Sequence, residues 1–211
     1  MSMSALDRIA FNLGRRDEVP NQELARQLVE MNDQVGVKEI AENLWHKNVN
    51  IQNDCIKVLY EVSYLKPEMI ADYAGEFVKL LNSKHNRMVW GAMIALSTIA
   101  SLKADELYPQ RDKIIKAIDK GSVITIDNGV MVLAEIAAAN VAYRQEIFPY
   151  LLDHLKTSRP KNIPQHAEKI AVAVTAHNKA EFIAVLEKRL EDMSPTQAAR
   201  IKKVIKQVSN R

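Results

Sequence analysis

A repeat of about 37 residues runs through the middle of this 211-residue chain and limits what it can fold into. Residues 49–85 align without a gap on residues 86–122, and apolar positions fall on apolar positions. Leu59 falls on Leu96 and then, one period later, on Leu133. Self-similarity at a period of 20–50 residues is typical of stacked supersecondary units. The chain is therefore expected to build its core between repeated units.

The spacing within each unit is helical. Ile56, Leu59 and Val62 follow one another at the interval of three residues that places side chains on one face of a helix. Glycine and proline are few, at six and seven residues, which is unusual for a loop-rich fold. The pattern predicts about twelve helices joined by short links. Their ranges are 4–13, 21–33, 36–47, 50–65, 67–82, 86–102, 108–119, 123–140, 143–156, 163–177, 179–192 and 195–208.

Two helix starts carry the capping-box pattern, in which side chains satisfy the first free amides of a helix. Asn178 with Glu181 is one, and Ser194 with Gln197 is the other. Both pairs predict a helix that begins at the following residue.

Four segments carry a family resemblance. Residues 107–109 (Leu-Tyr-Pro) followed by 113–118, and the similar segment 147–152, resemble the start of the second helix in HEAT repeats. Residues 92–100 resemble the Ala-rich first helix of that family. The resemblance implies an all-α, right-handed superhelical solenoid of antiparallel helix pairs. The first-helix proline and the turn aspartate of HEAT repeats are not regularly repeated, which leaves an armadillo-like variant open.

The expected organisation is a single α-solenoid domain over residues 1–211. Residues 1–35 are expected to form amino-terminal capping helices, and residues 36–192 the HEAT-like repeats. Residues 193–211 form a basic carboxyl-terminal capping helix in this scheme. Polar helices at both ends favour a monomer.

Several single residues are expected to serve packing. Cys55, the only cysteine, is predicted to be a small buried side chain. Trp90 is predicted to pack between repeats, and Gly91 and Gly129 to allow a close approach of neighbouring helices.

The histidines do not form a metal-binding pattern. His46, His85, His154, His166 and His177 include no HxxxH or HExxH pair, and the His-Glu pairs of the metal-dependent HEAT proteins that this chain resembles are absent. His85, His154 and His177 are instead predicted to lie near helix carboxyl termini, where the helix dipole favours a cation. No glycine-rich phosphate loop or nucleophile motif occurs. We therefore expect no catalytic residue, no metal, no cofactor and no enzymatic activity.

The charge distribution raises the alternative of nucleic-acid binding. The net charge is +3, from −2 over residues 1–105 and +5 over residues 106–211. Some alkylpurine DNA glycosylases are HEAT-like, and the chain resembles them in architecture. However, Trp45 and Trp90 lack the nearby acid of that motif, and Asp112 interrupts the possible basic stripe. Nucleic-acid binding therefore stays the secondary hypothesis.

The leading hypothesis is a non-enzymatic scaffold that binds a protein or peptide on the concave face of the solenoid. The amino terminus has no signal-peptide pattern, and no apolar run is long enough to span a membrane, so a cytoplasmic protein is expected. The predicted binding face consists of outward-facing residues of the second-layer helices. These are Glu42, Asp72, Glu76, Lys79, Lys113, Lys116, Lys120, Asp153, His154, Lys156, Lys188 and Glu191.

Overall fold

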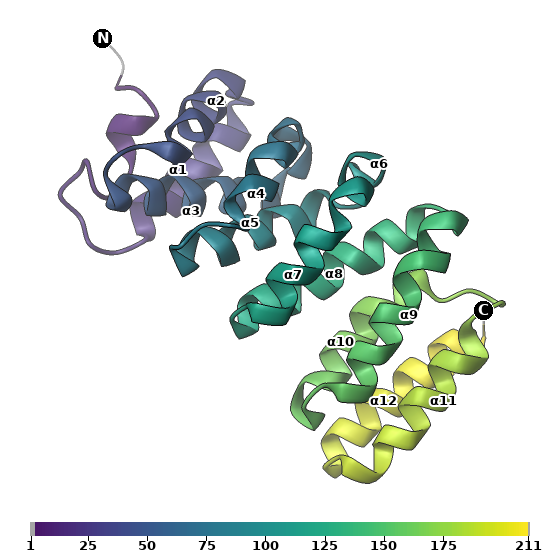
Figure 1. The fold of residues 1–211 in the computed structure, drawn as a ribbon. Helices are drawn as coiled ribbons and strands as arrows, with labels where there is room; N and C mark the ends of the chain where they lie inside the picture. The colour runs from purple at the N-terminus through teal and green to yellow at the C-terminus, as the bar shows by residue number, and fades with distance from the viewer. Residues whose placement is uncertain (1–2, 211) are drawn as a thin grey trace. The chain divides into compact units, whose positions relative to one another are not determined.

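The computed structural model describes residues 3–210, and within this range it contains helices and no strand (Figure 1). These residues fall into two compact units that divide between Asn128 and Gly129. We call residues 3–128 unit 1 and residues 129–210 unit 2. The prediction of an all-helical chain is confirmed. None of the described helices has the length and apolar character that a membrane crossing requires.

Unit 1 is built from consecutive helix pairs. Its helices are α1 (Val19–Glu30), α2 (Gln34–Glu42), α3 (Val49–Leu65), α4 (Ala74–Leu80), α5 (Asn86–Ile99), α6 (Ala104–Leu107) and α7 (Arg111–Lys120). Helix α8 (Val123–Ala139) begins in unit 1 and carries the division between the units. Helix α1 packs along α3, and α3 along α5, while α2 and α4 cover α3 and α5 respectively.

The core of unit 1 follows the repeat. Ile56 and Leu59 on α3, Phe77 on α4 and Leu96 on α5 are fully buried. Each such side chain contributes about 1.5–3 kcal/mol by leaving water. The apolar side chains that recur in the repeat therefore pack each helix pair against the next.

Small residues let α3 and α5 lie close together. A Cβ atom added at Gly91 would lie 2.6 Å from Cγ1 of Ile56, so this position on α5 requires glycine. Cys55 is fully buried beside Ile56. The predictions for Gly91 and Cys55 are confirmed.

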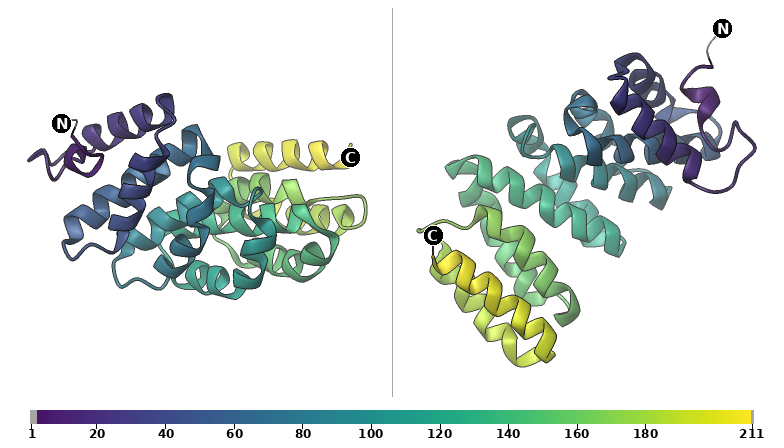
Figure 2. Two further views of the ribbon diagram at one scale, coloured as in Figure 1. Left: turned by 90° about the horizontal axis from the view of Figure 1, so that it is seen from above. Right: turned by 180° about the vertical axis from the view of Figure 1, so that it is seen from behind.

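Unit 2 continues with α9 (Val141–Thr157), α10 (Ile163–Ile170), α11 (Lys179–Arg189) and α12 (Pro195–Ser209). Helix α9 packs on α10 and α11, and α12 packs on α10 and α11 (Figure 2). The predicted capping box at the start of α12 is confirmed, because the Ser194 hydroxyl accepts from the Gln197 amide and the Gln197 side chain accepts from the Ser194 amide.

The structure corrects three of the local predictions. Residues 4–13 form only a short 3-10 turn at Leu6–Arg8. The amides of Ala10 and Phe11 donate to side chains of other helices, on Asn21 and Asp54, so no helix continues there. The predicted helix 67–82 begins as 3-10 turns, and α4 covers only its second half.

The capping box predicted at Asn178 and Glu181 does not form. Oδ1 of Asn178 accepts from the amide of Thr175, three residues upstream, and does not cap α11. The side chain therefore stabilises the turn before the helix and not the helix itself.

Candidate functional site

A cleft with a strong positive charge lies between α4, α5 and α7 of unit 1. Helix α7 buries Ile114, Ala117 and Ile118, so its lysines at other positions point outward. The cleft has a volume of about 250 Å³. Its lining residues are Leu81, Asn82, Ser83, Lys84, Asn86, Val89, Lys113, Lys116, Ala117, Lys120 and Gly121. We call it the lysine cleft.

Of the described residues that line the lysine cleft, none carries a carboxylate. Within residues 3–210, none of its four lysines forms an ion pair, whereas Lys79 nearby is paired with Glu76 at 2.6 Å. The amino end of α5 borders the cleft at Asn86, and the side chain of its N-cap residue, His85, does not cap the helix. Helix amino ends and free ammonium groups both attract anions.

A second, smaller cleft of about 220 Å³ shares Lys113 with the lysine cleft. It lies between α4 and the α6–α7 segment, and its lining includes Lys79, Glu106 and Gln110. Its charges are of both signs, unlike those of the lysine cleft.

The structure places the twelve residues of the predicted binding face in both units. Lys113, Lys116 and Lys120 come together in the lysine cleft. The Oε2 of Glu76 accepts from the Trp45 indole. Other members are paired elsewhere: Glu42 with Lys38, Asp72 with Lys103 and His154 with His166. Lys156 and Lys188 line a cleft of unit 2, and Asp153 and Glu191 are exposed. That this set binds a partner stays a prediction.

A larger cleft, of about 520 Å³, lies at the amino ends of α1, α3 and α5. Its lining residues are Ala10, Phe11, Arg15, Arg16, Asp17, Glu18, Asn50, Asn53, Asp54 and Arg87. We call it the amino-end cleft.

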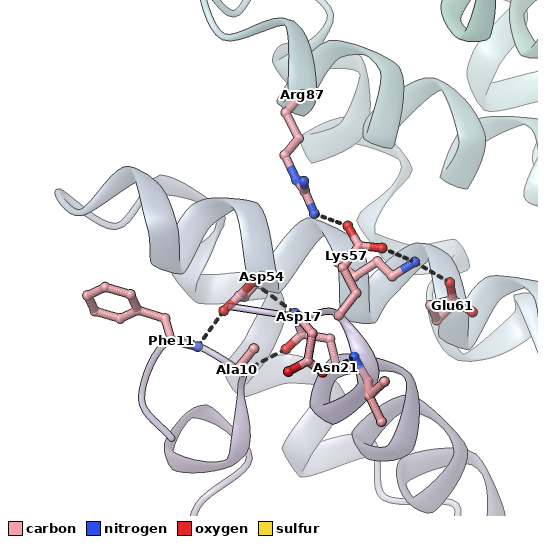
Figure 3. A network of polar contacts seen from close by, with 10 residues as sticks. Ala10, Phe11, Asp17, Asn21, Asp54, Lys57, Glu61 and Arg87 are labelled. Carbon is pink, nitrogen blue, oxygen red and sulfur yellow. Dashed lines mark hydrogen bonds and ion pairs between the residues drawn. The ribbon is translucent and has the colours of Figure 1, made fainter. Parts of the chain in front are cut away.

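A network of ion pairs fixes the walls of the amino-end cleft (Figure 3). Glu18, at the start of α1, accepts from Lys57 on α3 at 2.9 Å and from Arg87 on α5 at 2.6 Å. Lys57 also donates to Glu61 at 2.6 Å. One carboxylate therefore joins three helices.

Lys57 is the buried centre of this network, with a side chain only 6% exposed. Burial by itself lowers the pKa of Lys57, but hydrogen bonds with Glu61 and Glu18 outweigh it and raise the pKa above its ordinary value. The ammonium group therefore stays charged, and its charge is compensated from two sides.

A second part of the network holds the loop before α1. Asp54 on α3 accepts from the amide of Phe11 at 2.7 Å and from the side-chain amide of Asn21 at 2.8 Å. Asn21 is fully buried and accepts in turn from the amide of Ala10 (Figure 3). The loop that closes one side of the cleft is therefore attached to both α1 and α3.

Other polar groups of the amino-end cleft are unengaged. In the part of the chain that the structure describes, no hydrogen bond or ion pair involves the side chains of Arg16, Asn50 or Asn53. The guanidinium of Arg16 can donate hydrogen bonds to a ligand, and the side-chain amides of Asn50 and Asn53 can both donate and accept. The cleft thus combines fixed walls with free recognition groups.

Aromatic rings pack beside this network. Trp90 lies 5.8 Å from Tyr60, centroid to centroid, and the guanidinium of Arg87 lies over the Trp90 ring. The prediction that Trp90 packs between repeats is confirmed, since Tyr60 and Trp90 belong to successive repeats.

The histidine predictions are partly wrong. His85 is the residue before α5 and His177 lies just before α11, so both are at amino ends of helices. His154 is in the last turn of α9, as predicted. Over residues 3–210, no group of three or more His, Cys, Asp or Glu side chains could hold a metal ion.

Sequence reasoning did not identify the amino-end cleft. Its residues come from three helices and a loop, and Glu18 and Arg87 are 69 positions apart. The one available signal was a pair of adjacent arginines, Arg15 and Arg16, in a polar stretch between apolar segments.

Comparison with solved structures identifies the fold. An engineered protein matches with a TM-score of 0.65 at 17% identity, covering 99% of this chain and 98% of that one. The designed armadillo repeat protein YIII(Dq)4CqI matches with a TM-score of 0.64 at 17% identity, covering 96% and 99%. Kap121p, solved bound to Pho4p, matches with a TM-score of 0.63 at 15% identity, covering 94% of this chain and 22% of Kap121p.

The fold is therefore that of the HEAT and armadillo helical-repeat proteins, as the sequence resemblance implied. No family model matches the chain, and no curated protein matches its sequence.

Proposed function

We propose that this protein is a non-enzymatic interaction scaffold, and that it binds an extended segment of a protein partner in the amino-end cleft. The observation that carries the proposal is the combination of walls fixed by the Glu18–Lys57–Arg87 ion pairs with the unengaged side chains of Arg16, Asn50 and Asn53. A surface that is already rigid loses little conformational entropy on binding.

The unengaged groups suit a peptide backbone. A side-chain amide can donate to a backbone carbonyl and accept from a backbone N–H, so two asparagines on one helix face can hold an extended chain. Asn50 and Asn53 are three residues apart on α3, which places them on the same face. Arg16 adds a donor for a carboxylate or carbonyl oxygen.

Solved structures with this fold provide support. In its structure Kap121p is bound to Pho4p, and in another it is bound to Ste12p. The repeat fold therefore accommodates protein partners in a protein of similar architecture.

The test is a selection of peptides from a random phage-displayed library on the immobilised full chain. Selected peptides are then titrated by fluorescence anisotropy against the wild type and the double variant Asn50→Ala/Asn53→Ala. We expect the double variant to bind roughly tenfold more weakly, because two good hydrogen-bonding partners are lost. Asn82→Ala, in the lysine cleft, is the matched control and should bind as the wild type does.

Equal binding by the wild type and the double variant would overturn the proposal, and so would a selection that yields no binding peptide. Duplex and single-stranded DNA are titrated in parallel at low salt. DNA binding that is lost in an Arg16→Gln variant would instead support the nucleic-acid hypothesis.

A further inference from the structure

In the part of the chain that the structure describes, no ion pair compensates the positive charges of the lysine cleft. Lys84, Lys113, Lys116 and Lys120 bring four positive charges to about 250 Å³, and all four side chains are exposed. Like charges that line one cleft repel one another. An anionic ligand would relieve this repulsion.

We infer that the lysine cleft binds a short acidic segment of a protein partner, with glutamate or aspartate side chains around an aliphatic residue. The lining explains both parts of this description. The ammonium groups, together with the uncapped amino end of α5 at Asn86, attract carboxylates.

The apolar part of the lining accounts for the aliphatic residue. Leu81, Val89 and Ala117 line the cleft beside the lysines. A hydrophobic side chain of the partner gains free energy by covering these residues. A purely polar anion would not make this apolar contact.

The limited extent of the positive charge argues against a nucleic acid as the ligand. The adjoining cleft carries Glu106, and Asp112 and Asp119 are exposed on α7 between the lysines. Binding to duplex DNA depends on the neutralisation of several phosphates along the backbone. Four lysines bordered by acids fit a segment of a few residues.

This cleft is separate from the amino-end cleft and the inference does not depend on the proposed function. Helix α5 lies between the two, with Asn86 and Val89 facing the lysine cleft and Arg87 the amino-end cleft. A partner could use either cleft alone.

The test uses a short fluorescein-labelled peptide of glutamates around one leucine, titrated into the full chain by anisotropy. The cleft variant is Lys84→Gln/Lys116→Gln/Lys120→Gln. The control variant is Lys202→Gln/Lys203→Gln/Lys206→Gln, which removes the same charge from exposed positions of α12. All six lysines are exposed, so circular dichroism should show both variants folded.

We expect the cleft variant to bind the peptide roughly tenfold more weakly or worse, and the control variant to stay within about twofold of the wild type. Replacing the leucine of the peptide by serine should also weaken binding to the wild type. The Asn50→Ala/Asn53→Ala variant should bind this peptide normally, which separates the inference from the proposed function.

Equal losses in the two lysine variants would overturn the inference, because net charge would then explain the binding. No measurable binding to the wild type at low salt would also overturn it. Tighter binding of a short DNA duplex than of the peptide, lost only in the cleft variant, would assign the cleft to nucleic acid instead.

Discussion

Gly91 on α5 lies so close to Ile56 on α3 that a Cβ atom at position 91 would come within 2.6 Å of Cγ1 and 3.3 Å of Cγ2 of the isoleucine. Because Ile56 is fully buried, it has no free space into which to move. The spacing of the two helices therefore depends on the absence of a side chain at this position.

Gly91→Ala is expected to destabilise unit 1 by about 1–3 kcal/mol, as overpacking of a core does. Both tryptophans, Trp45 and Trp90, lie in unit 1, so urea unfolding followed by tryptophan fluorescence reports this loss. Gly75→Ala on α4 is the control, because a Cβ there meets nothing within 4 Å. It should be at least as stable as the wild type, because alanine restricts the unfolded chain more than glycine does. A neutral Gly91→Ala would show that the helix spacing is adjustable.

Glu18 is expected to make the stability of unit 1 depend on pH in the acid range. Burial raises the pKa of Glu18, but hydrogen bonds from Lys57 and Arg87 outweigh burial and lower the pKa below its ordinary value of 4.5. The contribution of the carboxylate is therefore fully present above about pH 4.5 and is lost as the pH falls through the lowered pKa.

Glu18→Gln should cost about 1 kcal/mol at neutral pH and give a flatter dependence of stability on pH between 5 and 3. Glu30→Gln at the end of α1, where the side chain is exposed, should follow the wild-type curve. Fluorescence-monitored urea unfolding at a series of pH values makes the comparison. Parallel curves for the wild type and Glu18→Gln would contradict the assignment.

Cys55 is expected to be unreactive in the folded protein. Burial, with a smaller effect of nearby carboxylates, raises the pKa of its thiol to about 12. At pH 8 the thiolate is then about one part in ten thousand. Alkylation by iodoacetamide, followed by mass spectrometry, should be negligible in buffer and complete in denaturing urea. Rapid alkylation in buffer would mean that the packing around α3 opens readily.

Ser194 is expected to stabilise the start of α12. Its hydroxyl accepts from the Gln197 amide as part of a reciprocal capping box. Ser194→Ala should cost about 1 kcal/mol. Thr196→Ala, at an exposed position in the same first turn, is the matched control. Unit 2 contains no tryptophan, so thermal melting followed by far-ultraviolet circular dichroism is the suitable measurement. Equal melting temperatures for both variants would show that the cap does not limit stability.

The sequence by itself determined the repeating helical architecture. Apolar residues recur at helical spacing within each repeat, and equivalent positions recur after about 37 residues. This pattern is enough to specify which face of each helix is buried. Gly91, Cys55 and the capping box at Ser194 were predictable for the same reason, since each depends on residues near in sequence or on the repeat. The prediction of a helix over residues 4–13 failed because backbone amides there donate to side chains far along the sequence. The capping prediction at Asn178 failed because its side chain accepts from an upstream amide.

Only the tertiary structure decided which polar groups meet. Glu18 precedes α1, Lys57 lies on α3 and Arg87 on α5, and no local pattern relates them. Lys84, in the segment between α4 and α5, meets Lys113, Lys116 and Lys120 of α7 in one cleft only in the folded chain. An amphipathic pattern specifies which face of a helix is buried, but the partner across the interface depends on how the helices pack. The exposed charges of this chain became two candidate binding clefts through that packing.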